Sequence, residues 1–152
     1  MPLHVGSLCP SLQGATEWID NAINVQELTG RPFMIIFWSM SCPACLEHLP
    51  LMQRWKMEHA DAGLKLVAVH VPYAQSGSDA IRVKQLLQSR QITLPCALDN
   101  ELSVSREFQT ENILPYYFMF DKNGKLKSRA ASEAGLKLLT SALMREIHTA
   151  LI

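Results

Sequence analysis

Two cysteines separated by two residues, Cys42 and Cys45, are the residues of this chain best suited to chemistry. The spacing alone is ambiguous, because a CxxC pair is found in redox-active disulfides and in half of many zinc sites. The six residues 33–38 are all apolar, as expected of a strand buried on both faces, and residues with helical spacing follow the pair. A dithiol at the transition from a buried strand to a helix favours thiol–disulfide chemistry.

The position of Cys42 at the start of the expected helix suits a nucleophile. Unpaired backbone N–H groups and the positive end of the helix dipole lie there, and both stabilise a thiolate. Pro43 fits the first turn, where a missing N–H costs nothing. Cys45 lies one turn further on, close enough to attack a mixed disulfide on Cys42. The alternative interpretations are two buried apolar cysteines or half of a metal site.

Two further cysteines, Cys9 and Cys96, do not form such a pair. Cys96 follows a proline in a short predicted strand, and we interpret it as an inert core residue. Cys9 lies in the weakly patterned N-terminal segment and could be exposed. Four scattered cysteines are too few for a disulfide-stapled secreted mini-domain.

The elements around the dithiol form a predicted βαβ unit. Residues 33–38 are the first strand, the helix after Cys42 ends before Gly63, and residues 64–71 form the second strand. Strand, helix and strand at this spacing imply a right-handed parallel crossover. Pro50 is expected to kink the helix, because proline removes a backbone hydrogen bond and clashes with the preceding turn.

The second half of the chain supplies further helices and a hairpin. Residues 79–90 and 99–108 are predicted to be helical, with a short strand at 94–98 between them. Residues 116–120 and 125–130 form an antiparallel hairpin, whose turn reads DKNG. An apolar stripe marks the last helix. The predicted helix caps are Ser78 or Asp79, Asp99, and Ser132.

A proline precedes the first hairpin strand. Pro115 follows Leu114 at a strand start, a position where a sheet tolerates proline. On its own it is a strand-entry proline. Together with the dithiol it predicts a cis Leu114–Pro115 bond, although only about 5–6% of X–Pro bonds are cis.

Length and residue order predict the architecture. The 152 residues fit one compact domain, 1–152, in which residues 1–30 form an N-terminal extension and no linker divides the chain. Parallel βαβ units followed by a hairpin and a closing helix predict an α/β sandwich with a mixed central sheet.

Charge and hydropathy exclude several partners. Lys plus Arg and Asp plus Glu both number 14, so the formal net charge is zero. This balance argues against nucleic acid and gives no attraction to an anionic membrane. No stretch approaches the ~20 apolar residues of a membrane-spanning helix. The start MPLHVGSLCPSLQ lacks the basic and apolar regions of a secretory signal. We therefore expect a soluble, cytoplasmic protein.

Two segments together resemble the thioredoxin superfamily. FWSMSCPACLEHLP resembles its active-site strand and helix, and ILPYYFMFDKNGKL resembles its cis-proline strand and hairpin. The N-terminal extension and the insertion before Pro115 resemble the TlpA/ResA branch, and SCPAC after FWSM, with VAVHVP, resembles the soluble YkuV-type oxidoreductases. The resemblance covers residues 9–148. It implies a thioredoxin-like sandwich with a mixed sheet of four to five strands flanked by helices, and a helical insertion before the cis-proline strand.

The resemblance also implies an enzyme, a thiol–disulfide oxidoreductase that needs no cofactor. Cys42 would attack and Cys45 would resolve. The substrates would be protein disulfides, reduced if the protein is cytoplasmic. The electron donor would be a thioredoxin reductase or a low-molecular-weight thiol. We expect a monomer.

Substrate contacts follow from the same resemblance. Pro115 would keep the substrate close to the dithiol, and the backbone of Leu114 would pair with an extended substrate segment. Pro43 and Trp38 are further candidates for substrate contact, although an aromatic residue that ends a buried strand is more often a core residue.

The sequence departs from the family pattern at three positions. Ile36 stands where thioredoxins carry a buried aspartate, Ser41 where they carry tryptophan, and His48 where ResA-like proteins carry glutamate. The usual base for the resolving thiol is therefore missing. His48, or its neighbour Glu47, is the candidate to take the proton of Cys45, and the alternative is that both are solvated helix residues.

Three other functions remain open. Cys42, Cys45 and a histidine could hold copper or zinc in a metal-binding module. A peroxidase of the same superfamily would carry threonine where this chain has Ser39. A structural or chaperone domain would bear the thiols without turnover.

Overall fold

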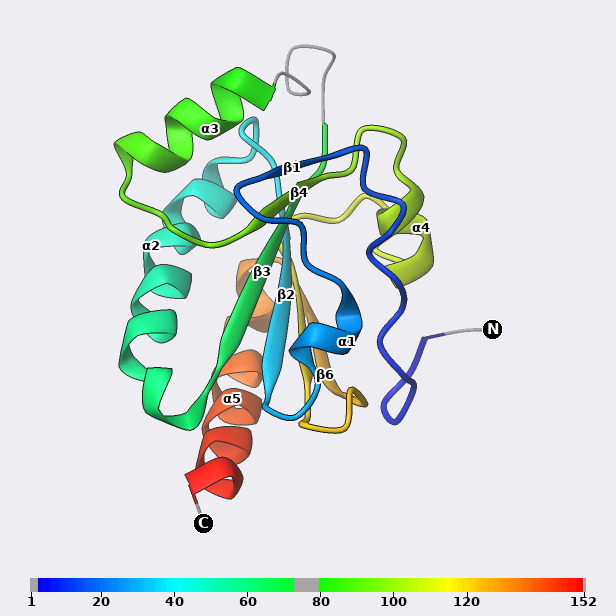
Figure 1. Ribbon diagram of the computed structural model, residues 1–152, viewed down its shortest axis with the longest axis vertical. Coiled ribbons are helices and arrows are strands. Elements are labelled where there is room, and N and C mark those ends of the chain that lie inside the picture. The colour runs from blue at the N-terminus through cyan, green and yellow to red at the C-terminus, as the bar shows by residue number, and fades with distance from the viewer. Residues whose placement is uncertain (1–2, 73–79, 152) are drawn as a thin grey trace.

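A six-stranded mixed sheet runs through the computed structural model, which describes residues 3–72 and 80–151 (Figure 1). The strand order is β1-β4-β3-β2-β5-β6, in which β2, β3 and β4 are parallel and the other neighbours antiparallel. The strands are β1 (Glu17–Ile19), β2 (Phe33–Trp38), β3 (Lys65–His70), β4 (Cys96–Leu98), β5 (Tyr116–Phe120) and β6 (Leu126–Ala131). The implied four to five strands are too few, because β1 from the N-terminal extension pairs with β4 and covers its open edge.

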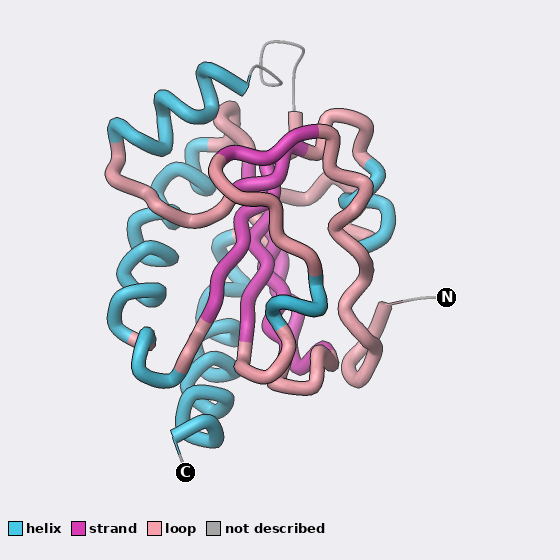
Figure 2. Tube along the Cα trace, in the orientation of Figure 1, coloured by secondary structure: helices cyan, strands magenta, loops and turns pink. Residues whose placement is uncertain are grey.

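Helices cover both faces of this sheet (Figure 1 and Figure 2). They are α1 (Val25–Leu28), α2 (Pro43–Glu58), α3 (Ala80–Ser89), α4 (Ser103–Phe108) and α5 (Leu136–Leu151), with 3₁₀ turns η1 (Ala60–Ala62) and η3 (Glu133–Gly135). α2, α3 and α5 pack on one face, and α1, α4 and the N-terminal segment pack on the other. The predicted α/β sandwich is confirmed. No helix within the described ranges is long and apolar enough to cross a membrane.

The central strand β2 explains the apolar run before the dithiol. Its side chains alternate between the two cores, with Met34, Ile36 and Trp38 on one face and Phe33, Ile35 and Phe37 on the other. A strand covered on both faces needs such a continuous run. β3 lies parallel to β2, as the predicted crossover requires.

The helix α2 begins directly after Cys42, which is its N-cap residue, and Pro43 occupies the first turn. The helix runs as one element past Pro50 to Glu58. The turn η1 then leads to Gly63, whose φ of 75° lies in the left-handed region that glycine adopts without strain. α2 therefore ends at Glu58, before Gly63, and Gly63 ends the 3₁₀ turn that follows it.

The hairpin between β5 and β6 forms as DKNG predicts, and it also holds the N-terminal extension. The Asp121 carboxylate accepts the N–H groups of Asn123 and Lys125. The N–H of Cys9 donates to the carbonyl of Gly124 at 2.9 Å. The extension is therefore bonded to the edge of the sheet.

The predicted helix caps have different outcomes. The Asp99 carboxylate accepts the N–H groups of Val104 and Ser105 in the first turn of α4, but the helix begins at Ser103 with Leu102 at the N-cap position, later than the predicted residue 99. The predicted cap at Ser132 is wrong: its φ is 60°, its side chain makes no capping bond, and η3 lies between it and α5. The cap expected at residues 78–79 lies outside the described residues.

Candidate active site

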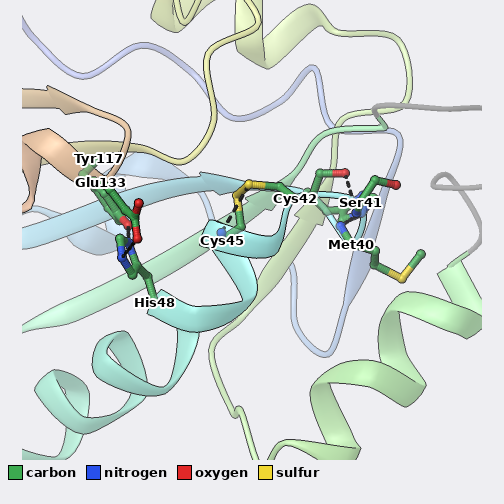
Figure 3. Close-up of a disulfide and its surroundings, with 9 residues drawn as sticks. Met40, Ser41, Cys42, Cys45, His48, Tyr117 and Glu133 are labelled. Carbon is green, nitrogen blue, oxygen red and sulfur yellow. Dashed lines mark hydrogen bonds and ion pairs between the residues drawn. A yellow bond between two sulfur atoms is a disulfide. The ribbon is translucent and has the colours of Figure 1, made fainter.

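A disulfide joins Cys42 and Cys45 at the start of α2 (Figure 3). Their Cα atoms are 5.2 Å apart, and the two residues are only 7% and 2% exposed. The Sγ of Cys42 also accepts the N–H of Cys45 at 3.2 Å. Two sulfur atoms and a backbone donor able to stabilise a thiolate on Cys42 therefore lie together.

A tight turn, Ser39–Cys42, carries the chain from β2 into α2. The N–H of Cys42 donates to the carbonyl of Ser39 at 3.1 Å, and the N–H of Ser41 donates to the hydroxyl of Ser39 at 3.3 Å. The N–H of Met40 donates to Nε2 of His70 at 3.2 Å. His70 lies in β3, as the sequence predicts, and its side chain also bonds to the turn through Met40.

His48, one turn beyond Cys45, contacts two residues that sequence reasoning missed. Its Nδ1 is hydrogen-bonded to the hydroxyl of Tyr117 in β5, and its Nε2 lies 3.8 Å from Oε1 of Glu133 in η3. Figure 3 shows the three side chains gathered together, with the disulfide one helical turn away along α2. Tyr117 is 69 residues from His48 along the chain, so no local pattern marks it as a partner.

The two contacts of His48 involve different ring nitrogens, Nδ1 with Tyr117 and Nε2 with Glu133. Nδ1 either donates to the hydroxyl oxygen of Tyr117 or accepts its O–H, according to the tautomer of the ring. In the tautomer that donates at Nδ1, Nε2 keeps a free lone pair on the side of Glu133. Burial, together with the charge of Glu133, raises the pKa of Tyr117, so its phenol stays protonated. A proton placed on Nε2 would face the Glu133 carboxylate, whose Oε1 lies 3.8 Å away.

The other candidates from the sequence are spread over the surface and the core. Glu47 and Pro43 are exposed on α2. Ile36 lies in the same buried cluster as Cys45, so that cluster has no carboxylate at this position. Trp38 is 0% exposed and packs in the core, the position that an aromatic residue at the end of a buried strand usually takes.

The start of β5 lies at the same end of the sheet as the start of α2. The Leu114–Pro115 peptide bond is cis. Tyr116 pairs with Phe37 of β2, which brings Pro115 to the end of the sheet from which the chain continues to Cys42. Neither the N–H nor the carbonyl of Leu114 is bonded to another described residue.

The two remaining cysteines, Cys9 and Cys96, are free thiols. Cys96 is fully buried in β4, which confirms it as a core residue. Cys9 is half-buried rather than exposed, because the extension packs on the sheet. Burial raises the pKa of each thiol to about 12. Neither is suited to nucleophilic attack near neutral pH.

A disulfide that opens to two thiols at the start of a helix is suited to dithiol–disulfide exchange. Held by a mixed sheet with helices on both faces, it defines a thiol–disulfide oxidoreductase with a thioredoxin-like fold. Residues 5–129 match the AhpC/TSA family, and the chain belongs to this family. In the described part of the chain, no group of three or more His, Cys, Asp and Glu side chains could hold a metal ion.

Two of the relatives that this chain resembles are thiol–disulfide oxidoreductases. The thiol-disulfide oxidoreductase YkuV of Bacillus subtilis (strain 168) is 31% identical over 137 residues, which are 90% of this chain and 91% of YkuV. The thiol-disulfide oxidoreductase ResA of Bacillus cereus is 21% identical over 143 residues, covering 94% of this chain and 79% of ResA. A solved thioredoxin-like protein in the oxidized form matches with a TM-score of 0.85 at 29% identity, over 95% of this chain and 97% of that one. The resemblance to YkuV and to ResA-type proteins is therefore confirmed.

Proposed function

We propose that the protein reduces disulfide bonds of protein substrates, with Cys42 as the attacking thiol and Cys45 as the resolving thiol. The observation that carries this assignment is the position of Cys42 as N-cap of α2, where its Sγ accepts the N–H of Cys45. Helix N-termini lower the pKa of cysteine and so favour the nucleophilic thiolate. The named relatives support exchange chemistry but do not fix its direction.

The reaction transfers two electrons to the substrate in two exchanges. The Cys42 thiolate attacks one sulfur of the substrate disulfide, which forms a mixed disulfide and releases the other substrate sulfur as a thiolate that takes up a proton. Cys45 then loses its proton and attacks Sγ of Cys42, which releases the second substrate thiol and forms the Cys42–Cys45 disulfide. A thioredoxin reductase or a low-molecular-weight thiol returns two electrons and two protons to the pair.

His48 is the proton acceptor for Cys45 in this scheme, through a bridging water. It is 13% exposed, it lies one turn from Cys45 on α2, and Tyr117 and Glu133 hold its ring. Residues three apart share a helix face, whereas Glu47 lies two residues from Cys45 and is exposed. Glu47 is the alternative acceptor.

The backbone of Leu114 is the proposed docking strand for substrate. Its N–H and carbonyl are not bonded to other described residues, so both can pair with an extended segment that carries the disulfide. Pro115 keeps that segment near the dithiol, and the exposed Pro43 adds contact beside Cys42.

A monomeric protein in the cytoplasm is the proposed setting. Two free thiols in a chain with four cysteines suit a reducing compartment. Dithiol exchange of this kind also needs no second subunit and no cofactor.

Trapping of substrate tests the attack order. A Cys45→Ser variant should accumulate a mixed disulfide through Cys42, because no second thiol releases the substrate. A Cys42→Ser variant should trap nothing. Both are incubated with an oxidised model protein, and the adducts are mapped by mass spectrometry. Equal trapping by the two variants would contradict the assignment.

A further inference from the structure

His70 is a fully buried imidazole directly behind the turn that carries Cys42. It is the last residue of β3 and is 0% exposed. Its Nε2 accepts the N–H of Met40 at 3.2 Å, and its ring meets the Trp38 indole edge-on, with centroids 4.9 Å apart. None of the proposed reaction steps uses this residue.

The hydrogen bond requires a neutral ring. To accept the N–H of Met40, Nε2 must be unprotonated, so the single ring proton lies on Nδ1. Nδ1 has no partner among the described residues, and an unsatisfied buried donor is unfavourable. Burial lowers the pKa of His70 to about 4, in agreement with a neutral imidazole.

Among the described residues, the groups packed around His70 supply no charge that would protonate it. Trp38 of β2 faces one side of the ring. On the β4 side, Leu98 pairs with His70 and Cys96 pairs with Ala68, two residues earlier in β3. Burial raises the pKa of the Cys96 thiol to about 12, so that it stays neutral. The Asp99 carboxylate is occupied by N–H groups of α4.

His70 is the acceptor for a turn N–H group that lies outside the turn, in the neighbouring strand β3. The N–H groups of Ser41 and Cys42 bond to Ser39, within the turn itself. Among the described hydrogen bonds of the N–H groups of residues 40–42, the bond from Met40 is the one that reaches another element. The local bonds shape the turn, and His70 ties it to β3.

We propose that His70 is a positioning residue for the dithiol. His70 anchors the Ser39–Cys42 turn to β3, and this anchoring sets where Sγ of Cys42 lies relative to the N–H of Cys45. The inference rests on the proposed attack by Cys42. Its effect is greatest in the reduced protein, because the disulfide no longer restrains the turn there. A Cys42 thiolate depends on that N–H as a charge-assisted donor.

Three variants test the proposal: His70→Leu, which removes the acceptor, His70→Gln, whose side-chain carbonyl can restore it, and Val69→Ala, a control at a buried neighbour on the other face. Amide hydrogen exchange of Met40 is the direct readout. The N–H of Val71, which bonds to Trp38, is the internal control for global destabilisation. We expect Met40 to exchange about tenfold faster or more in His70→Leu, with Val71 unchanged and with recovery in His70→Gln.

Thiolate absorbance of Cys42 in the reduced variants is the functional readout. We expect about tenfold less thiolate at neutral pH in His70→Leu, recovery in His70→Gln, and no change in Val69→Ala. Unchanged Met40 exchange in His70→Leu, or a thiolate fraction that does not follow it, overturns the proposal. Failure of Cys45→Ser to trap substrate would instead refute the proposed attack order, and the thiolate measurement would still decide the role of His70.

Discussion

At the scale of single residues, the four cysteines differ in how readily they form thiolates. We predict that alkylation of the reduced native protein near neutral pH modifies Cys42 first, because it begins α2. Cys9 and Cys96 should stay unmodified, since burial raises the pKa of each to about 12. Mass spectrometry of partly alkylated protein identifies the order. Faster modification of Cys45 or Cys9 would show that the roles are assigned wrongly.

The second residue-scale prediction concerns the proton of Cys45. His48→Ala should slow the resolving step by about 10²-fold, the lower end for general-base catalysis. Tyr117→Phe should slow it less, because the imidazole stays but loses a partner that orients it. Stopped-flow reduction of a model disulfide measures the step, and Glu47→Ala is the matched control. A loss confined to Glu47→Ala would transfer the role to Glu47, and no loss in any variant would leave solvent as the acceptor.

The third residue-scale prediction concerns acid stability. Folding lowers the pKa of His70 from 6.5 to about 4, so between these values the unfolded chain binds a proton that the folded protein does not. The free energy of unfolding should therefore fall as the pH drops from 6.5 towards 4, by up to ~3 kcal/mol from this residue. Urea unfolding across this range should show a shallower decline in His70→Gln. Identical pH profiles for both proteins would refute the burial effect.

At the scale of elements, the Asp99 carboxylate stabilises the first turn of α4. Its carboxylate is fully buried and accepts two backbone N–H groups and the hydroxyl of Ser105. Asp99→Ala should lower the free energy of unfolding by ~2–3 kcal/mol, because it leaves buried donors of the first turn without a partner. Chemical denaturation compares it with Glu101→Ala, an exposed acidic residue of the same loop. Equal losses in the two variants would refute the capping role.

At the scale of the whole molecule, Arg129 of β6 joins three parts of the chain. Its guanidinium donates to the carbonyl of Leu3 at 3.1 Å, to the carbonyl of Gln109 after α4 at 2.8 Å, and to the hydroxyl of Tyr116 at 3.0 Å. It also lies 5.1 Å from the ring centroid of Phe118. A planar group with five donors can bond to such a set at once, whereas a lysine ammonium cannot match its geometry.

Arg129→Leu should therefore release the N-terminal extension and destabilise the fold by ~2–3 kcal/mol. Arg129→Lys should give an intermediate loss. Limited proteolysis detects cleavage in residues 3–12, and denaturation gives the free energy. Activity of the dithiol, which lies elsewhere, should persist under stabilising conditions. Wild-type protease resistance in Arg129→Leu would show that the other bonds of the extension suffice.

The sequence by itself determined the features that depend on neighbouring residues. The apolar run 33–38, the CxxC pair after it and Pro43 together define a buried strand that feeds a helix with Cys42 at its start. The DKNG turn defines the hairpin in the same way. These patterns are readable because strand alternation, helix capping and turn geometry each involve residues only a few positions apart.

Only the tertiary structure decided which distant side chains meet. Tyr117 and Glu133 reach His48 because β5 and η3 pack beside α2, and His70 reaches Met40 because β3 lies next to β2. Trp38 is core rather than surface because the sheet is covered on both faces, and β1 adds a sixth strand because β4 leaves an edge open. Such contacts join residues far apart in the chain, and they depend on how whole elements pack, which no local pattern specifies.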